Sequence, residues 1–556
     1  MPLKGELKKV IDVDYNSRLA RIIKGEVLDD DQTLTTYSRD ASIFQIKPTL
    51  IVYPKDVEDI KSLVYFVTQN PNKNLSITVR SAGTDMTGGA IGESIILDVK
   101  KYLNKLISLE GETAVVEPGM LYKDFEAETA KLGLLLPTFP ASREICTVGG
   151  MVANNAGGEL ELTYGPINKY LKSMKSILAD GNEYVFKPLT QAQLNKKIAQ
   201  KDFEGKIYSE IYDLIMENKD LVKNAKPKTS KNSTGFDLWE VWDGQFFDLT
   251  KLLIGSQGTL GIITEIEFKL IKPKPNHVLL VISLPSLSEL DQVIKTVLEY
   301  KPEAFECFDD QTLNLAATHA WDLTRNFKYS NRFSAYLQLF PEKFQQLTNS
   351  LPKLVLMANF ASDSKDGALK QAEAAKLALK SFNLKAEIKL SEKEQEKYWL
   401  IRHKSFGLLM KYAQNTKASP FIDDIIVKPE YLPEFLPKLN QLIKPFKDKM
   451  VYTLAGHIGD GNFHIIPLMD LSKEDVRAVI PELMEKVFKL VFEYQGSMSA
   501  EHNDGLIRGP YLPQMYGDEV YQLFKKVKQI FDPKNIFNPH KKVDASFKYS
   551  LEHLVT

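Results

Sequence analysis

The chain is poor in cysteine, with Cys146 and Cys307 as its two thiols in 556 residues. Two cysteines exclude a disulfide-dense secreted scaffold, and they exclude an iron–sulfur cluster held by four thiolates of this chain. Long hydrophobic runs are also missing: 278–282 is among the longest apolar stretches, far short of the roughly 20 residues of a membrane helix. The N-terminal residues lack the apolar centre of a secretory signal. We therefore expect a cytoplasmic protein without a transmembrane segment, with the inner face of a membrane as an alternative location.

Neither positive nor negative charge is in excess. Lys and Arg total 71 and Asp and Glu total 72, which gives a formal net charge of −1. A balanced chain has no overall electrostatic attraction to nucleic acid or to anionic lipid, so we expect no nucleic-acid partner. At about 150 residues per domain, the length predicts two to four domains.

Strand and helix signals are mixed along most of the chain, which favours an α+β architecture. Short β-rich runs such as LIVY and SIILDV end at Gly, Pro or Asp, and helical stretches lie between them. A second set begins with the strand HVLLVISL and the helix SLSELDQVIKTVLEY, and we predict a further strand at RFSAYLQLF. We expect a lead-in over 1–45, α+β domains over 46–272 and 273–510, and a helical segment over 511–556.

Three glycine-rich loops stand out in the first of these domains, at 80–89, 147–158 and 255–263. Glycine lets the backbone adopt positive φ and approach a ligand closely, and consecutive N–H groups can bind an anion. One such loop is more often a tight turn, but three within about 200 residues favour a large anionic cofactor. The first loop is neither a Rossmann fingerprint nor a P-loop.

Two histidines flank a turn signal in the segment GHIGDGNFHII. Taking Asp460-Gly461 as a two-residue hairpin turn places His457 directly opposite His464, with Cβ atoms about 5 Å apart. Two imidazoles at that distance suit one metal ion, and Glu501, in SAEHNDG, is the natural third ligand. Two histidines and a carboxylate leave coordination positions open, as catalytic sites do. Asn462 either supports this site or completes the turn.

The glycine motifs RSAGTDMTGG, EPGM, CTVGGMVANNAGG and GSQGTLGIITE resemble the FAD domain of vanillyl-alcohol-oxidase/PCMH-type flavoproteins, over about residues 46–272. The resemblance implies a PCMH-type FAD-binding domain with two subdomains. Because the first loop lacks the His that some relatives link to FAD, it implies non-covalent FAD, with Cys146 as a small buried residue. The FAD contacts that it implies are Arg80, Ser81, Ala82, Gly83, Thr84, Asp85, Thr87, Gly88, Pro118, Gly119, Thr147, Gly149, Gly150, Asn154, Asn155, Ala156, Gly157, Gly158, Tyr164, Gly258, Gly261, Ile262, Ile263 and Asn538.

HIGDGNFH and the Glu-His dipeptide resemble the C-terminal domain of FAD-linked D-2-hydroxyacid dehydrogenases, which include D-lactate and D-2-hydroxyglutarate dehydrogenases and glycolate oxidase subunits. The resemblance implies a cap domain with an antiparallel sheet that carries the metal site, and a C-terminal segment that returns to the flavin. It implies a divalent metal, usually zinc, with manganese or iron as alternatives. By this resemblance the ligands are His457, His464 and Glu501, the base is His502, and Arg402 and Lys417 contact the substrate, Lys417 on a poorer match.

One motif departs from that family. Many relatives read E-H-G-x-G, whereas this chain has Asn503 and Asp504 after the Glu-His dipeptide. The variant SAEHNDGLIRGPYL resembles the flavin half of large fused flavin/iron–sulfur dehydrogenases. Because this chain has two thiols, we expect a separate electron acceptor: an iron–sulfur protein, an electron-transfer flavoprotein or a quinone.

The resemblance implies FAD- and metal-dependent oxidation of a D-2-hydroxy acid, of the D-lactate or D-2-hydroxyglutarate type, to the 2-oxo acid, with hydride passing from C2 to flavin N5. One alternative is a sugar-lactone or alcohol oxidase of the same superfamily, which does not need the metal site. Another is a flavin subunit that relays electrons without catalysis. A metallohydrolase would leave the glycine loops unexplained. The sequence leaves the 2-hydroxy acid, the metal and the oligomeric state open.

Overall fold

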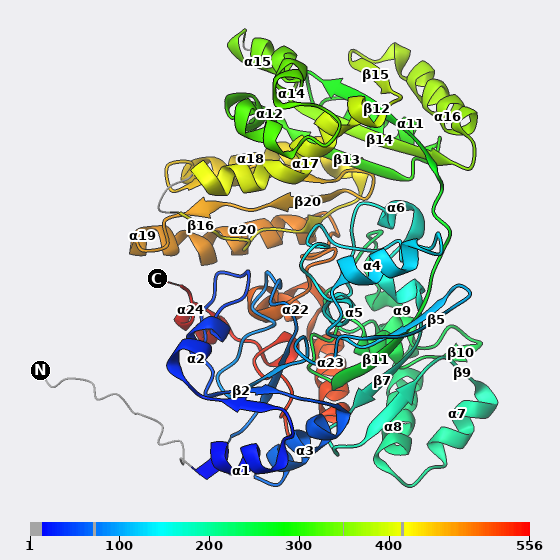
Figure 1. Cartoon of the computed structure of the whole chain (residues 1–556), viewed down its shortest axis with the longest axis vertical. Coiled ribbons are helices and arrows are strands. Elements are labelled where there is room, and N and C mark those ends of the chain that lie inside the picture. The colour runs from blue at the N-terminus through cyan, green and yellow to red at the C-terminus, as the bar shows by residue number, and fades with distance from the viewer. Residues whose placement is uncertain (1–13, 71–73, 349, 413–415, 556) are drawn as a thin grey trace, which may run out of the picture.

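The computed structural model describes residues 14–70, 74–348, 350–412 and 416–555. Figure 1 shows two lobes, with a seven-stranded sheet and its helices in the upper lobe and two further sheets in the lower lobe. The first thirteen residues of the predicted lead-in lie outside the described residues. None of the helices in the described part of the chain combines the length and the apolar character that a bilayer crossing requires.

The first sheet of the lower lobe has four strands and holds the first glycine loop at its end. Its apolar strand residues pack against α3 (Val57–Thr68), whose Ile60, Leu63, Val64 and Val67 recur at helical spacing and are buried. Loop 80–89 starts where β3 ends. The sheet order is β1 (Glu26–Leu28), β2 (Leu50–Tyr53), β4 (Ile95–Asp98) and β3 (Ile77–Arg80), with β2 and β3 parallel to β4.

The second sheet of the lower lobe is antiparallel and five-stranded. The helix α23 (Asp518–Phe531), near the C-terminus, packs in this lobe. Its Leu523, Phe524 and Val527 share a hydrophobic core with α8 (Phe203–Glu217). Figure 1 shows α23 beside α8 and this sheet. The strand order is β5 (Leu106–Glu110), β6 (Thr113–Val116), β11 (Ile262–Lys269), β7 (Leu171–Ile177) and β8 (Glu183–Phe186).

The upper lobe is built on a seven-stranded antiparallel sheet that is buried on both faces. Along the strand β12, Val278 and Leu280 pack in one cluster with helices α11 (Leu290–Leu298) and α16 (Lys365–Ala378). The alternate residue Leu279 packs in another cluster, with helices α12 (Asp310–Thr318) and α17 (Glu392–Tyr412). The order is β15 (Lys385–Lys389), β12 (Asn276–Leu284), β14 (Leu354–Ser362), β13 (Ala304–Asp309), β19 (Leu454–His457), β20 (Asn462–Ile465) and β17 (Ile425–Ile426).

The strand predicted at RFSAYLQLF is wrong, because this segment forms the helix α14 (Arg332–Gln338). The side chain of Asn331 accepts a hydrogen bond from the backbone N–H of Ser334 and so caps the helix. Ala335 and Leu339 are buried one turn apart. Further apolar residues lie on the other sides of this helix, and together with the buried ones they form an apolar run that resembles a strand in the sequence.

Candidate active site

A cavity of about 830 Å³ runs between the glycine loops of the lower lobe and the upper sheet. This size is typical of a small-molecule or cofactor site. The side chains of Cys146, Arg402, His457, His464, Glu501 and His502 also line it. The predicted cofactor residues that line it are Ser81, Gly83, Thr84, Asp85, Pro118, Gly149, Gly150, Asn154, Ala156, Gly157, Gly158, Gly258, Gly261 and Ile263.

The other predicted cofactor residues are not among those that line the cavity. Thr147 caps helix α5 (Val148–Asn154) by accepting a hydrogen bond from Gly150, and Asn155 ends the helix with a φ of +50°. These residues shape the second loop without lining the cavity. The predicted residues that do not line the cavity are Arg80, Ala82, Thr87, Gly88, Gly119, Thr147, Asn155, Tyr164, Ile262 and Asn538.

Asn538 joins the C-terminal segment to two of the glycine loops. Its Nδ2 donates to the carbonyl oxygens of Gly89 and Gln257, each at 2.8 Å. Tyr164 instead turns away to donate to Glu303 at 2.7 Å, beside a second, smaller cavity of about 260 Å³. Asn538 therefore holds the cavity walls together, whereas Tyr164 lines a different space.

The cavity fits a large flat cofactor because main chain forms much of its wall. At Gly157 a Cβ atom would lie 1.8 Å from Glu161 Oε2 and 2.6 Å from Glu501 Oε2, so the second loop passes directly against these carboxylates. At Gly258 the backbone has a φ of +68°, which favours glycine. The glycines thus bring the backbone up to the cavity and to the histidine site.

The histidine hairpin has a different register from the predicted one. His457 pairs with Asn462, and His464 pairs with Ala455. A two-residue type I′ turn needs positive φ at both central residues, but of Asp460 and Gly461 only Gly461 has it. The connection is therefore a four-residue turn over 458–461.

The two imidazoles still lie on one face of the hairpin. Side chains alternate between faces with a period of two, so a shift of two residues preserves the face. The ring centroids of His457 and His464 are 5.1 Å apart and the ring planes are perpendicular. The predicted face is therefore confirmed, whereas the predicted direct pairing is wrong.

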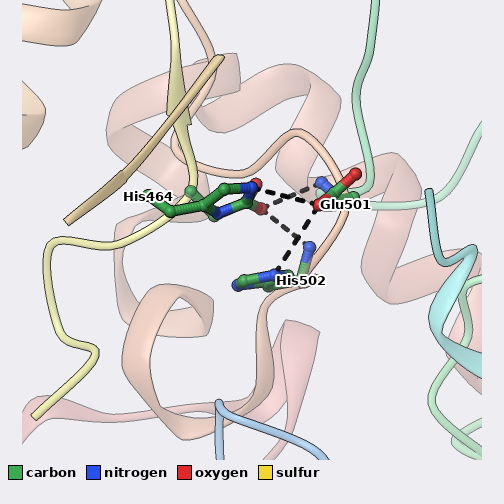
Figure 2. A group of neighbouring side chains, drawn as sticks. His464, Glu501 and His502 are labelled. Carbon is green, nitrogen blue, oxygen red and sulfur yellow. Dashed lines mark hydrogen bonds and ion pairs between the residues drawn. The ribbon is translucent and has the colours of Figure 1, made fainter. Parts of the chain in front are cut away.

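One oxygen of Glu501 lies close to a ring nitrogen of each histidine. Glu501 Oε1 lies 3.3 Å from His457 Nε2 and 3.3 Å from His464 Nε2, and Figure 2 shows His464, Glu501 and His502 pointing toward one another. Ligands bound at 2.0–2.1 Å around a tetrahedral zinc ion stand about 3.3–3.4 Å apart. The donor set and its spacing therefore fit a divalent metal ion.

Buried carboxylates lie beside the opposite nitrogens of these rings, and the contact with His457 is a hydrogen bond. Glu306 Oε1 lies 2.5 Å from His457 Nδ1, and Asp423 Oδ1 lies 3.4 Å from His464 Nδ1. Such partners fix the tautomer and orientation of metal-binding histidines. Glu306 and Asp423 were not predicted from the sequence, although acidic residues inside the apolar runs AFECF and FIDDII were an available signal.

Asp424, His464, Glu501 and His502 form a group of possible metal ligands whose ligand atoms all lie within 4.8 Å of one another, and His457 is not part of that group. The carboxylate of Asp424 is already engaged, however. Oδ2 accepts from the Ser499 hydroxyl and from the backbone N–H groups of Glu501 and His502, and Oδ1 accepts from Asn462. We assign Asp424 to shaping the segment that carries Glu501, and Asn462 to holding Asp424.

The carboxylates change the protonation of both histidines. Burial alone would lower the pKa of His457, but Glu306 raises it to about 9. Burial also opposes protonation of His464, and Asp423 and Glu501 raise its pKa to about 9. Without a metal ion both rings are therefore cationic at neutral pH, and a metal that binds them must displace their protons.

A buried lysine balances the acidic groups behind the histidines. Lys231 Nζ lies 3.2 Å from Glu161 Oε2, 3.5 Å from Asp460 Oδ2 and 3.6 Å from Glu501 Oε2. Burial would lower the pKa of Lys231, but these three carboxylates raise it well above its usual value. Lys231 was not predicted from the sequence, where nothing distinguishes it from exposed lysines nearby.

Arg402 lines the cavity but is partly engaged. Its Nε donates to Glu306 Oε2 at 3.0 Å and its Nη2 lies 2.9 Å from the same oxygen, so it extends the contact from Glu306 to His457. Lys417 is not among the residues that line the cavity; it lies on β16 (Lys417–Ala418), in a three-stranded sheet. The structure therefore brings Arg402, and not Lys417, to the site.

The backbone conformation at position 503 explains why Asn503 is accepted there. Its φ is +71°, in the left-handed region that favours glycine and that Asn tolerates. Its Nδ2 donates to the carbonyl oxygens of Asn154 and Gly255, at 3.1 and 2.8 Å. The asparagine thereby ties the segment of Glu501 and His502 to the second and third glycine loops.

Two family models match this chain. Residues 48–186 match the FAD binding domain, and residues 273–542 match the C-terminal domain of FAD linked oxidases. The solved structure of p-cresol methylhydroxylase with substrate bound shares the fold at 14% identity, with a TM-score of 0.67 over 95% of this chain and 96% of that one. The predicted α+β fold with a PCMH-type FAD-binding part is confirmed.

Curated relatives are similar at modest identity. D-2-hydroxyglutarate dehydrogenase of Escherichia coli (strain K12) is 26% identical over 91% of this chain and 49% of its own length, so the chain spans about half of that relative. D-lactate dehydrogenase of Archaeoglobus fulgidus is 24% identical over 89% of this chain and 91% of its own length. The resemblance to FAD-linked dehydrogenases is confirmed.

Replacing Lys231 with Met should destabilise the fold by about 3 kcal/mol, because three buried carboxylates lose their counter-charge. Urea unfolding measures this. Lys197→Met is the matched control: the Lys197–Glu204 pair is partly exposed, so the expected loss is about 1 kcal/mol or less. Adding Glu161→Gln to Lys231→Met should recover part of the stability. Equal losses for the two single variants would contradict the assigned role.

Metal-free protein should lose stability as the pH rises from about 6.5 to 9. The pKa values of about 9 for His457 and His464 exceed the ordinary value of about 6.5. Their contribution is therefore complete below pH 6.5 and disappears as the pH passes through 9, by on the order of 3 kcal/mol for each ring. Urea unfolding in chelator at several pH values measures it. If the His457→Gln variant loses stability with rising pH as steeply as the unaltered protein, His457 is not a source of the pH dependence.

Proposed function

We propose that this chain, which belongs to the FAD-linked oxidases, oxidises a D-2-hydroxy acid to the 2-oxo acid with FAD and a divalent metal ion as cofactors. The main support is the convergence of His457, His464 and Glu501 on one point of the wall of the glycine-lined cavity. A 2-hydroxy acid offers a carboxylate and a hydroxyl that one metal ion can chelate. Zinc suits this set, and manganese or iron also accept it.

The cofactors would bind to different walls of the cavity. The glycine loops would hold FAD without a covalent bond, since no His lies in the first loop, and burial raises the pKa of the Cys146 thiol to about 12. The histidines and Glu501 would hold the metal. When bound, the metal supplies Lewis acidity toward the substrate hydroxyl, and the flavin supplies a two-electron acceptor for hydride from C2.

Arg402 would orient the substrate carboxylate. A guanidinium can bind a carboxylate through two parallel N–H groups, and Arg402 lines the cavity while Glu306 holds its Nε and Nη2. The substrate would thus meet an arginine whose orientation is already set.

His502 would take the proton of the substrate hydroxyl. It lines the cavity; its Nδ1 lies 2.8 Å from Asp423 Oδ2, and its Nε2, which would face the substrate, lies 3.9 Å from Glu501 Oε1. Burial alone would lower the pKa of His502, but Asp424 and Asp423 raise it. The same carboxylates would stabilise the imidazolium once the proton has arrived.

The electrons would pass to a separate acceptor: an iron–sulfur protein, an electron-transfer flavoprotein or a quinone. The two thiols Cys146 and Cys307 are buried and far too few for a four-thiolate cluster.

Anaerobic mixing of the FAD-loaded protein with D- and L-lactate, D- and L-2-hydroxyglutarate and glycolate tests the function. We expect a D-2-hydroxy acid to bleach the flavin absorbance, and chelation to abolish bleaching until zinc or manganese is returned. Metal analysis of the same sample accompanies the assay. Bleaching that survives chelation would favour the alcohol or lactone oxidase, and no bleaching with any acid would favour the non-catalytic relay.

Replacing His502 with Gln should slow flavin reduction by about 100- to 10,000-fold, the usual contribution of a general base, while FAD and metal content stay unchanged. Stopped-flow absorbance measures the rate. His403→Gln is the matched control, since His403 lines the same cavity but its Nε2 contacts Glu159. A comparable loss in both variants would contradict the role of His502.

A further inference from the structure

The far end of the upper lobe exposes large apolar side chains on α13 (Ala320–Leu323), α14 and α15 (Phe340–Leu347). Figure 1 shows α14 and α15 at the end of the molecule opposite α1 (Asp14–Ile22). Each of these side chains is between 51% and 80% exposed. We call this group the apolar tip: Trp321, Phe333, Leu337, Phe340, Phe344 and Leu347.

The helix α14 is apolar on two sides, whereas the inward side of α15 carries the buried Glu342. Phe333 and Leu337 lie one turn apart on the outward side of α14, whereas Ala335, between them, is buried. On α15, Phe340 and Phe344 repeat this outward spacing. A helix at the surface of a protein normally has one apolar side, and grouped exposed apolar residues mark an interaction site. The outward sides are uncovered in the part of the chain that the structure describes.

Basic residues outnumber acidic ones in the segment that carries the tip, although Glu392 of the neighbouring helix α17 contacts Tyr329. Residues 320–347 contain two acidic residues, Asp322 and Glu342. Asp322 pairs with Lys411 at 2.8 Å, and Glu342 is buried and pairs with Lys397 at 2.7 Å. The basic residues of the same segment are Arg325, Lys328, Arg332 and Lys343. Arg325 also pairs with Asp322, at 3.8 Å, and Lys328 lines the main cavity, so Arg332 and Lys343 are the basic residues that we assign to the tip.

Two basic side chains of the tip helices lie over aromatic rings. The guanidinium of Arg332 lies 4.3 Å from the centre of the Trp321 ring, and the amine of Lys343 lies 5.6 Å from the centre of the Tyr336 ring. Positive charge therefore sits among the apolar groups of the tip, although the chain as a whole carries −1. The electrostatic complement of this surface is an anionic one.

We propose that the apolar tip docks on the surface of an anionic lipid bilayer. Its aromatic rings would enter the headgroup region, and its basic side chains would meet lipid phosphates. A second copy of this chain would bring the same positive charges together, which disfavours that occupant. Asn326 and Lys328, which follow α13, line the main cavity, so docking would hold one wall of the cavity near the bilayer.

Vesicle flotation of the FAD-loaded full chain tests the proposal. We expect binding to vesicles of equal parts phosphatidylglycerol and phosphatidylcholine, no binding to phosphatidylcholine alone, and release by high salt. The double variant Phe333→Ser/Phe344→Ser should weaken binding by about tenfold or more. The matched control is Ile107→Ser/Leu132→Ser, since both residues are exposed and apolar in the lower lobe, and it should bind like the unaltered protein.

Thermal unfolding and light scattering complete the test. Equal melting temperatures of the two double variants would show that both fold. Failure of the unaltered protein to bind anionic vesicles, or equal binding by the tip variant, would overturn the proposal. The proposal would also be overturned if the unaltered protein is a dimer that does not bind vesicles and the tip variant is a monomer. That result would show that the tip contacts a second copy of the chain.

Discussion

The candidate site depends on the meeting of Glu501 Oε1 with His457 and His464. These residues come from a hairpin and from a segment almost 40 positions later in the sequence. The buried carboxylates of Glu306 and Asp423 lie beside the outer nitrogens of the two rings, and Lys231 offsets the charge behind Glu501. Removal of any one partner would leave a buried charge or a free ring, so the group acts as one unit.

The same segment joins this unit to the glycine loops. Asn503 donates to the second and third loops, and Gln257 of the third loop accepts from Gly505 and donates to Thr87 of the first. These bonds fix the distance between the histidines and the cavity wall where the flavin would lie. Hydride transfer needs such fixed positions, because small misplacements of reacting atoms lower the rate steeply.

Local patterns were enough to predict much of the fold and the identity of the central residues. Apolar strand runs, helical spacing and glycine loops are short-range signals, and they indicated an α+β fold and a cavity lined by three loops. The Glu-His dipeptide and the two histidines around Asp-Gly pointed to the site for the same reason. The helix at 332–338 was missed, because apolar residues on both of its sides imitate a strand.

The sequence by itself determined which residue types are available: a carboxylate, imidazoles and loops that accept a large anionic ligand. Only the tertiary structure decided the hairpin register, because the turn at 458–461 follows contacts with other elements, such as that of Gly459 with Phe305. It also decided that Glu306, Asp423 and Lys231 belong to the site. Long-range packing brings these charges together, and no pattern along the chain records which distant elements will meet.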